Sequence, residues 1–225
     1  MFNIQPSPAA LPVHHPSRRK PALILAALAA VAVLCWLFPL FHVVPLKKAE
    51  AQQQAGVFKT EIFAREFWET KLLPATQRGV DLKGLLAALA KDPAAARKQH
   101  GRTLGIGGAT LFLVRGSGKV TAVEDHAVMV ALDDSDAKVG LNIGLLFGNT
   151  VRDASGLLDV SAYPNSQDFN DISTQLNGIV ENKVAPALRE KAAVGKTIRF
   201  AGCFELEDDA RPDALQIVPI KIEWP

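Results

Sequence analysis

Cysteine, tyrosine and net charge are all scarce in this sequence, and each scarcity excludes a class of protein. Its 225 residues contain two cysteines, Cys35 and Cys203, which form no CxxC pair and lie in no Cys/His cluster. A structural zinc site is therefore not expected. Because the two cysteines lie in very different parts of the chain, a disulfide bond between them is not expected either. We predict no bound metal and no cofactor.

The near balance of charge argues against nucleic acid as a partner. The chain has 25 basic and 23 acidic residues, and residues 1–46 contain three of the basic residues and none of the acidic ones. The remainder therefore has a net charge of −1, whereas nucleic-acid-binding domains present a basic footprint. Tyr163 is the only tyrosine, so base-stacking platforms are also scarce.

A run without a single charged residue extends over residues 21–46. It supplies the roughly 20 apolar residues that cross a bilayer. Arg18, Arg19 and Lys20 precede it directly, which favours a cytoplasmic N-terminus. We expect a cytoplasmic disordered tail over 1–20, a single inner-membrane helix over 21–46, and a C-terminal domain in the periplasm.

Two other interpretations of this run stay open. A cleaved signal peptide needs a short apolar core and a small-x-small site, but the run is long and becomes bulky after Ala32. A lipoprotein needs a cysteine preceded by small residues, and Cys35 directly follows Leu34. The uncleaved anchor is preferred over both.

Helical periodicity dominates residues 47–100. The pattern predicts an amphipathic helix from Phe58 that ends before Pro74, and a second helix capped by Asp81. Asp92 and Pro93 form the start of a third helix, which Gly101 ends. We interpret residues 47–100 as a helical stalk or cap.

Strand-like runs follow in residues 101–225, and one helix interrupts them. The expected strands cover residues 110–114, 118–123, 127–132, 139–147, 157–160, 198–204 and 217–224, and the expected helix covers 168–183, with a break at Pro186. Five or six antiparallel strands with a helix before the last hairpin match an OB-like barrel. The predicted fold class is α+β: an antiparallel OB-like β-barrel, a helical segment before it, and one transmembrane helix.

Several short motifs in order resemble a known family. They are Phe67–Pro74, Gly79–Leu82, Gly116–Val120, Ile143-Gly144, Gly148–Ala154 and Gly195–Thr197. Together they resemble a family of predicted periplasmic lipoproteins of unknown function, often encoded beside sugar ABC importers. The resemblance implies an envelope protein with an OB-like core, whose partner is an importer component or its solute-binding protein. It implies no catalytic residues, and the motif around Cys35 departs from the family.

A set of polar residues in and after the glycine-bearing segment 143–150 is the candidate binding site. The candidate ligand-binding residues are Asn149, Arg152, Asp153, Tyr163, Asn165 and Gln167. Amide, carboxylate and guanidinium groups are suited to hydrogen bonding with neutral polyols, so the candidate ligand is a small polar solute. The alternative is structural: Arg152 and Asp153 pair locally, and the amides cap turns.

The function expected from these observations is a membrane-anchored periplasmic accessory or binding protein, associated with sugar import, and not an enzyme. No arrangement of nucleophile and base is visible. The alternative is an envelope carbohydrate-active enzyme that uses Asp153 or Asp159 as its carboxylate.

Overall fold

The computed structural model describes residues 59–103, 108–159, 166–207 and 215–225, together with Leu25, Leu28, Ala29 and Val31. The chain divides into two compact units, Met1–Val57 and Phe58–Pro225. The four isolated residues are helical, but the rest of the expected anchor and the whole expected tail lie outside the described residues. Among the residues that are described, no helix combines the length and the apolar character needed to cross a membrane.

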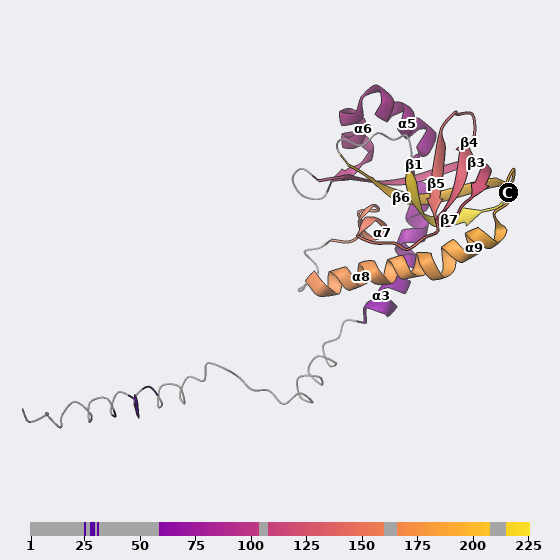
Figure 1. The fold of residues 1–225 in the computed structure, drawn as a ribbon. Coiled ribbons are helices and arrows are strands. Elements are labelled where there is room, and N and C mark those ends of the chain that lie inside the picture. The colour runs from indigo at the N-terminus through magenta and orange to yellow at the C-terminus, as the bar shows by residue number, and fades with distance from the viewer. Residues whose placement is uncertain are drawn as a thin grey trace, which may run out of the picture. The chain divides into compact units, whose positions relative to one another are not determined.

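Five strands of the second unit pair in a closed circuit (Figure 1). The described residues form seven strands in all: β1 (Val80–Asp81), β2 (Arg102–Thr103), β3 (Thr110–Val123), β4 (Ala127–Leu132), β5 (Lys138–Asn142), β6 (Thr197–Leu206) and β7 (Gln216–Glu223). The circuit runs β3-β4-β5-β7-β6 and returns to β3. Strands β1 and β2 pair with β3 outside this circuit.

The prediction of a purely antiparallel sheet was wrong. Strands β5 and β7 are parallel, and so are β1 and β3, whereas the other pairs of the circuit are antiparallel. A closed circuit with an odd number of strands cannot alternate direction at every step, so one neighbouring pair must be parallel. Between the parallel strands β5 and β7, the chain passes through several helices and strand β6.

The helices are mostly those expected, with different ends. They are α3 (Thr60–Phe67), α4 (Leu73–Ala75), α5 (Leu82–Lys91), α6 (Pro93–His100), α7 (Thr150–Asp153), α8 (Ser166–Ile179) and α9 (Ala185–Lys191). Asp81 and Asp92 are the N-caps of α5 and α6, and they accept hydrogen bonds from Gly84 N and Ala95 N at 2.9 and 3.0 Å.

The two prolines expected to end helices do not end them. Pro74 and Pro186 each follow a π-helical turn, Trp68–Leu72 and Val180–Val184, and the helix continues through both. A proline in a regular helix clashes with the carbonyl four residues earlier and lacks the N–H that would bond to it. In both helices the wider π turn ends two residues before the proline, where it relaxes this constraint.

Three predicted strand boundaries also changed. Residues 110–114 and 118–123 form one continuous strand, β3. Gly118 fits inside it because a Cβ there would collide with the Ala131 carbonyl of β4. Strand β5 ends at Asn142, whose side chain accepts a hydrogen bond from Gly144 N at 2.8 Å and turns the chain. Residues 157–159 form no strand.

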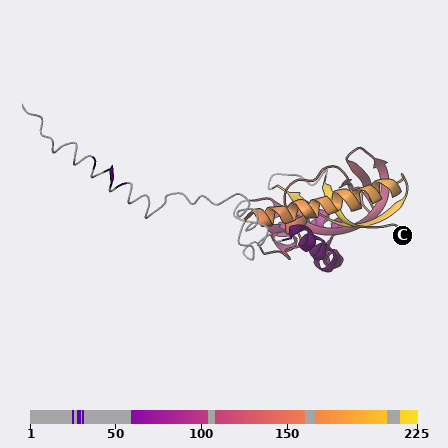
Figure 2. The same ribbon diagram turned by 90° about the horizontal axis from the view of Figure 1, so that it is seen from below.

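Apolar side chains pack into two clusters, one on each side of the sheet. The inner cluster includes Phe112, Val130, Leu141 and Phe200, and α5 and α9 contribute Leu85 and Leu188 to it. The outer cluster joins β3, β6 and β7, through Leu111, Cys203 and Ile220, to helices α3 and α8. Figures 1 and 2 both show α8 and α9 as one long rod along the sheet.

Candidate functional site

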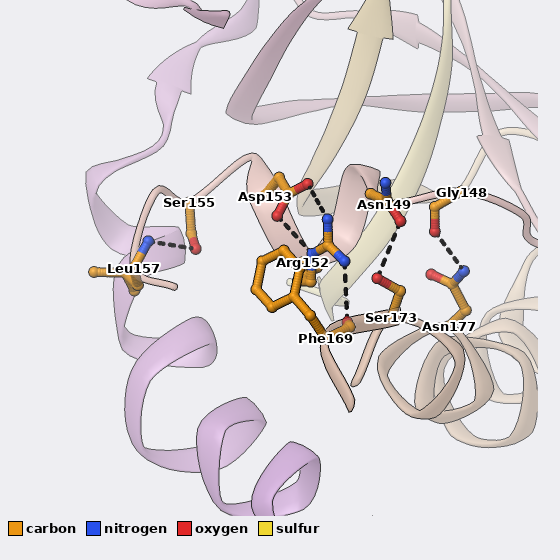
Figure 3. Close-up of polar contacts among 9 residues, drawn as sticks. All are labelled: Gly148, Asn149, Arg152, Asp153, Ser155, Leu157, Phe169, Ser173 and Asn177. Atoms are coloured by element: carbon orange, nitrogen blue, oxygen red, sulfur yellow. Dashed lines mark hydrogen bonds and ion pairs between the residues drawn. The ribbon is translucent and has the colours of Figure 1, made fainter. Parts of the chain in front are cut away.

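The predicted polar set is divided between two elements and a part of the chain that is not described. Arg152 and Asp153 lie on α7, Asn149 lies directly before it, and Gln167 lies on α8. Tyr163 and Asn165 lie outside the described residues. Figure 3 shows the contacts around α7.

Arg152 and Asp153 form a closed, buried ion pair. Each is only 4% exposed. Arg152 donates from Nε to Asp153 Oδ1 and from Nη2 to Asp153 Oδ2, both at 2.7 Å. Its Nη1 donates to the carbonyl oxygen of Phe169 at 3.0 Å, and its guanidinium carbon lies 3.6 Å from the Phe169 ring centroid. This bidentate geometry is the strong form of the interaction, and it attaches α7 to the start of α8.

Further polar contacts attach the loop before α7 to α8 and to the π turn that follows it. These contacts were not predicted from the sequence. Ser173 Oγ donates to Asn149 Oδ1 at 3.2 Å, and Asn177 Nδ2 donates to the carbonyl of Gly148 at 3.1 Å. Leu146 N donates to Glu181 Oε1 at 2.6 Å. We call this set of contacts, together with the Arg152–Asp153 pair, the α7 brace.

Gln167 makes a contact of its own. Its Nε2 donates to Asp171 Oδ1 of the same helix at 2.8 Å, on an exposed surface. The described members of the polar set are therefore bonded to neighbouring protein groups, as the structural alternative expected for Arg152 and Asp153. The ligand-binding role proposed for the whole set stays a prediction.

A different polar hollow of about 640 Å³ lies over strands β3, β6 and β7. It is lined by Thr76, Gln77, Asp81, Arg115, Gly116, Ser117, Arg199, Phe200, Ala201, Lys221 and Glu223. We call it the arginine hollow. Six of its strand residues fall into two rows across the sheet. In one row Ala201 lies between Arg115 and Lys221, and in the other Arg199 lies between Ser117 and Glu223.

The acidic groups in and beside this hollow already have partners. Lys221 Nζ lies 2.7 Å from Glu223 Oε1. The hydrogen bond and the charge of Lys221, with a smaller contribution from Arg199, lower the pKa of the Glu223 carboxyl. Asp81 caps α5, and Asp133, beside the hollow, accepts a hydrogen bond from Ser117 Oγ at 2.7 Å.

The side chains of Arg115 and Arg199, unlike these acidic groups, have no hydrogen-bond or ion-pair partner among the described residues. Both side chains lie on exposed positions of their strands. The hollow thus presents two guanidinium groups that are free to bind an anion.

The thiol of Cys203, in contrast, is inaccessible to a substrate. It lies on β6 in the outer cluster, fully buried, and burial raises the pKa of its thiol far above the ordinary value. A buried thiol that stays protonated is a poor nucleophile. Among the described residues, no three His, Cys, Asp or Glu side chains are placed to hold a metal ion.

The arginine hollow could not be predicted from local sequence patterns because its residues are spread from Thr76 to Glu223. The signal available in the sequence was alternation along three strands: Arg115 and Ser117, Arg199 and Ala201, Lys221 and Glu223. Each pair lies on one face of its strand. Only the register between strands brings the three pairs together.

The circuit of strands and its crossing helices are those of an OB-fold domain. The chain is similar to an OB-fold protein from Thermotoga maritima whose crystal structure is known, with a TM-score of 0.66 and 24% sequence identity. The similarity covers 75% of this chain and 99% of that one. This identifies the fold class, and the OB-like part of the predicted fold is confirmed.

The chain belongs to the family described as predicted periplasmic lipoprotein (DUF2291), which its sequence matches over residues 30–223. The resemblance noted from the motifs is therefore confirmed. No match was found among curated proteins.

Proposed function

We propose that this protein is a membrane-tethered, non-enzymatic binding or accessory protein that contacts its ligand or partner at the arginine hollow. The observation that carries the proposal is the pair of unpartnered guanidinium groups, Arg115 and Arg199, over an open polar hollow. Membership of a family of predicted periplasmic lipoproteins supports a periplasmic position for this domain.

The tether in this proposal is the apolar segment 21–46, as an uncleaved single-pass helix with a cytoplasmic N-terminus. Its length and the three basic residues before it support this arrangement. Helix α3 of the second unit begins at Thr60, and residues 47–59 lie between it and this segment.

The geometry of the candidate catalytic groups favours a binding function over an enzymatic one. Asp153, one of the two carboxylates considered for an envelope carbohydrate-active enzyme, has both oxygens bonded to Arg152 and is buried. A general acid or base must reach its substrate within hydrogen-bonding distance. The buried thiol of Cys203 is equally out of reach.

The proposed partner is a component of an importer, its solute-binding protein or a small polar solute. Site-specific photo-crosslinking in intact cells tests whether the hollow faces it. A crosslinking residue at Gln77, an exposed position in the hollow, should yield discrete adducts. The same residue at Lys138, exposed on β5 and outside the hollow, is the control. Identical adducts at both positions, or none at Gln77, would contradict a protein partner at the hollow and leave a small solute as the ligand.

Reporter fusions test the tether independently. A reporter that is active only outside the cytoplasm should be active after Pro225 and inactive at residue 15. Cys35→Ser should remain in the membrane, because a helix of about 20 apolar residues holds a protein more firmly than one acyl chain. Release of this variant into the soluble fraction would instead establish a lipid anchor at Cys35.

A further inference from the structure

Three cationic side chains surround one small side chain in the arginine hollow. Arg115 of β3 and Lys221 of β7 are the direct cross-strand neighbours of Ala201 on β6. Arg199 lies two residues along β6, on the same face. The methyl group of Ala201, itself 7% exposed, leaves open the space that a longer side chain would occupy.

The positions of Arg115 and Arg199 on neighbouring strands allow both guanidinium groups to lie over the space beside Ala201. Arg115 pairs with Ala201 and Ser117 pairs with Arg199, so Arg115 and Arg199 are diagonal neighbours on adjacent strands. Diagonal positions in a sheet lie about 7–8 Å apart, which is within reach of two long side chains. A guanidinium group presents a planar fork of donors that matches the oxygens of a carboxylate or a phosphate.

No carboxylate of the described residues lies within ion-pair distance of either guanidinium group, although the charge of Glu223 interacts with Arg199. Asp81 bonds to the backbone of α5, Glu223 bonds to Lys221, and Asp133 bonds to Ser117. Two like charges placed as diagonal neighbours repel each other. An oxyanion between them would attract both guanidinium groups and offset this repulsion.

The remaining lining is polar and suits the rest of a small solute. Gln77, an exposed amide, and Ser117, a hydroxyl, border the hollow. The volume of about 640 Å³ is within the range of small-molecule sites, about 300–1,000 Å³. A bare phosphate or carboxylate group would fill only part of it.

We propose that the arginine hollow binds the oxyanion group, phosphate or carboxylate, of a small polar ligand between Arg115 and Arg199. This inference rests on the proposed function and names the chemistry of that same site. The oxyanion accepts hydrogen bonds from both guanidinium groups, and its charge is balanced by them.

The test is the thermal unfolding of the full chain in phosphatidylcholine nanodiscs, titrated separately with inorganic phosphate, citrate and a neutral hexose. A ligand that binds only the folded state raises the unfolding midpoint. We expect phosphate or citrate to raise the midpoint of the wild type and the hexose to leave it unchanged. The effect should weaken at high salt, because the arginines are exposed and screened.

Arg115→Ala and Arg199→Ala should each weaken anion binding about tenfold or more, since a hydrogen bond to a charged group contributes that much. Lys138→Ala, which removes one exposed positive charge from β5, should leave binding unchanged and is the matched control. Equal weakening by all three substitutions would show a general charge effect and overturn the site.

A second arm distinguishes a free anion from a lipid headgroup. Phosphatidylcholine headgroups are zwitterionic, so nanodiscs that also contain the anionic lipid phosphatidylglycerol should raise the midpoint only if an anionic headgroup is the ligand. Arg115→Ala with Arg199→Ala should abolish that rise. Either source supports the oxyanion site. The absence of any anion-dependent shift, or a shift that the double variant retains, would overturn it. Discrete crosslinks at Gln77 together with no anion effect would overturn this inference and leave the proposed function intact.

Discussion

Two groups of arginines in this domain have opposite environments. Arg152 in the α7 brace is 4% exposed and donates hydrogen bonds to Asp153 and to the Phe169 carbonyl. The side chains of Arg115 and Arg199 in the arginine hollow are exposed and donate no hydrogen bond to any residue that the structure describes.

The difference follows from the cost of burying charge. A buried charge must be paired and hydrogen-bonded, because the interior does not solvate it. An exposed arginine is solvated by water and can stay unpaired at little cost. Stability therefore explains the partners of Arg152, whereas it gives no reason for two free arginines to converge over one hollow.

Arg97 shows a third arrangement, in which backbone carbonyl groups accept hydrogen bonds from its guanidinium group. It extends from α6 to the end of β6, where Nη1 donates to the Leu206 carbonyl at 2.8 Å and Nη2 donates to the Glu207 carbonyl at 2.6 Å. This arginine joins a helix to the sheet, as Arg152 joins two helices. Both have structural partners, which separates them from the pair in the arginine hollow.

Among the proposed substitutions, Arg152→Ala should have the largest effect on stability. It leaves the Asp153 carboxylate buried and unpaired, so we expect a loss of about 3–5 kcal/mol in the free energy of unfolding. This loss corresponds to a fall of roughly 10 °C in the melting temperature. The apolar double variant Arg152→Met with Asp153→Leu is the control and should recover much of the loss. A melting temperature for Arg152→Ala equal to that of the wild type would contradict a structural role.

Glu181→Ala tests the other end of the α7 brace. The substitution removes the acceptor for Leu146 N, a charge-assisted bond of 2.6 Å, and should cost about 1.5–3 kcal/mol. Amide hydrogen exchange should accelerate at Leu146 and leave strand β3 protected. Gln175→Ala, at a half-buried position of α8, is the control; similar acceleration in both variants would show that the loop is not held by Glu181.

The buried thiol of Cys203 predicts a pH dependence. Because burial raises its pKa in the folded state, its contribution to stability is complete below the unfolded pKa and is lost as the pH rises above about 9. The loss should be about 1.4 kcal/mol per pH unit there. Denaturant unfolding at pH 8 and pH 10 measures it, in the Cys35→Ser background. The Cys203→Ala variant should lose less stability than its parent between the two pH values; an equal loss in both would refute this explanation.

The smallest expected effect lies in the arginine hollow. Lys221→Ala removes the main cause of the lowered pKa of Glu223, so this pKa should rise toward the ordinary value of about 4.3. The change is local because both side chains are largely exposed. A carboxyl NMR titration measures the shift, and an unchanged pKa would mean that Lys221 does not interact with Glu223 in solution.

Features that depend on neighbouring residues could be predicted from the sequence, whereas features that depend on contacts between distant segments could not. The caps at Asp81 and Asp92 and the helix over 168–183 depend on neighbouring residues, and the structure has them. The strand break before Gly118 and the helix ends at Pro74 and Pro186 were predicted wrongly, because partner strands and π turns decide them. The sequence also could not distinguish a buried arginine from a free one. Arg152 is buried by Phe169, which lies on a helix that sequence periodicity cannot place against α7.

The difference between the structural Arg152 and the two arginines of the hollow is tested most directly by the melting temperature of the Arg115→Ala and Arg199→Ala double variant. These arginines have no partner among the described residues, so the free energy of unfolding should stay within about 0.5 kcal/mol of the wild type, as for ordinary surface substitutions. Arg152→Ala, measured beside it, should be destabilised by several kcal/mol. A double variant that melts as low as Arg152→Ala would show that the arginines of the hollow are structural, and would contradict the account.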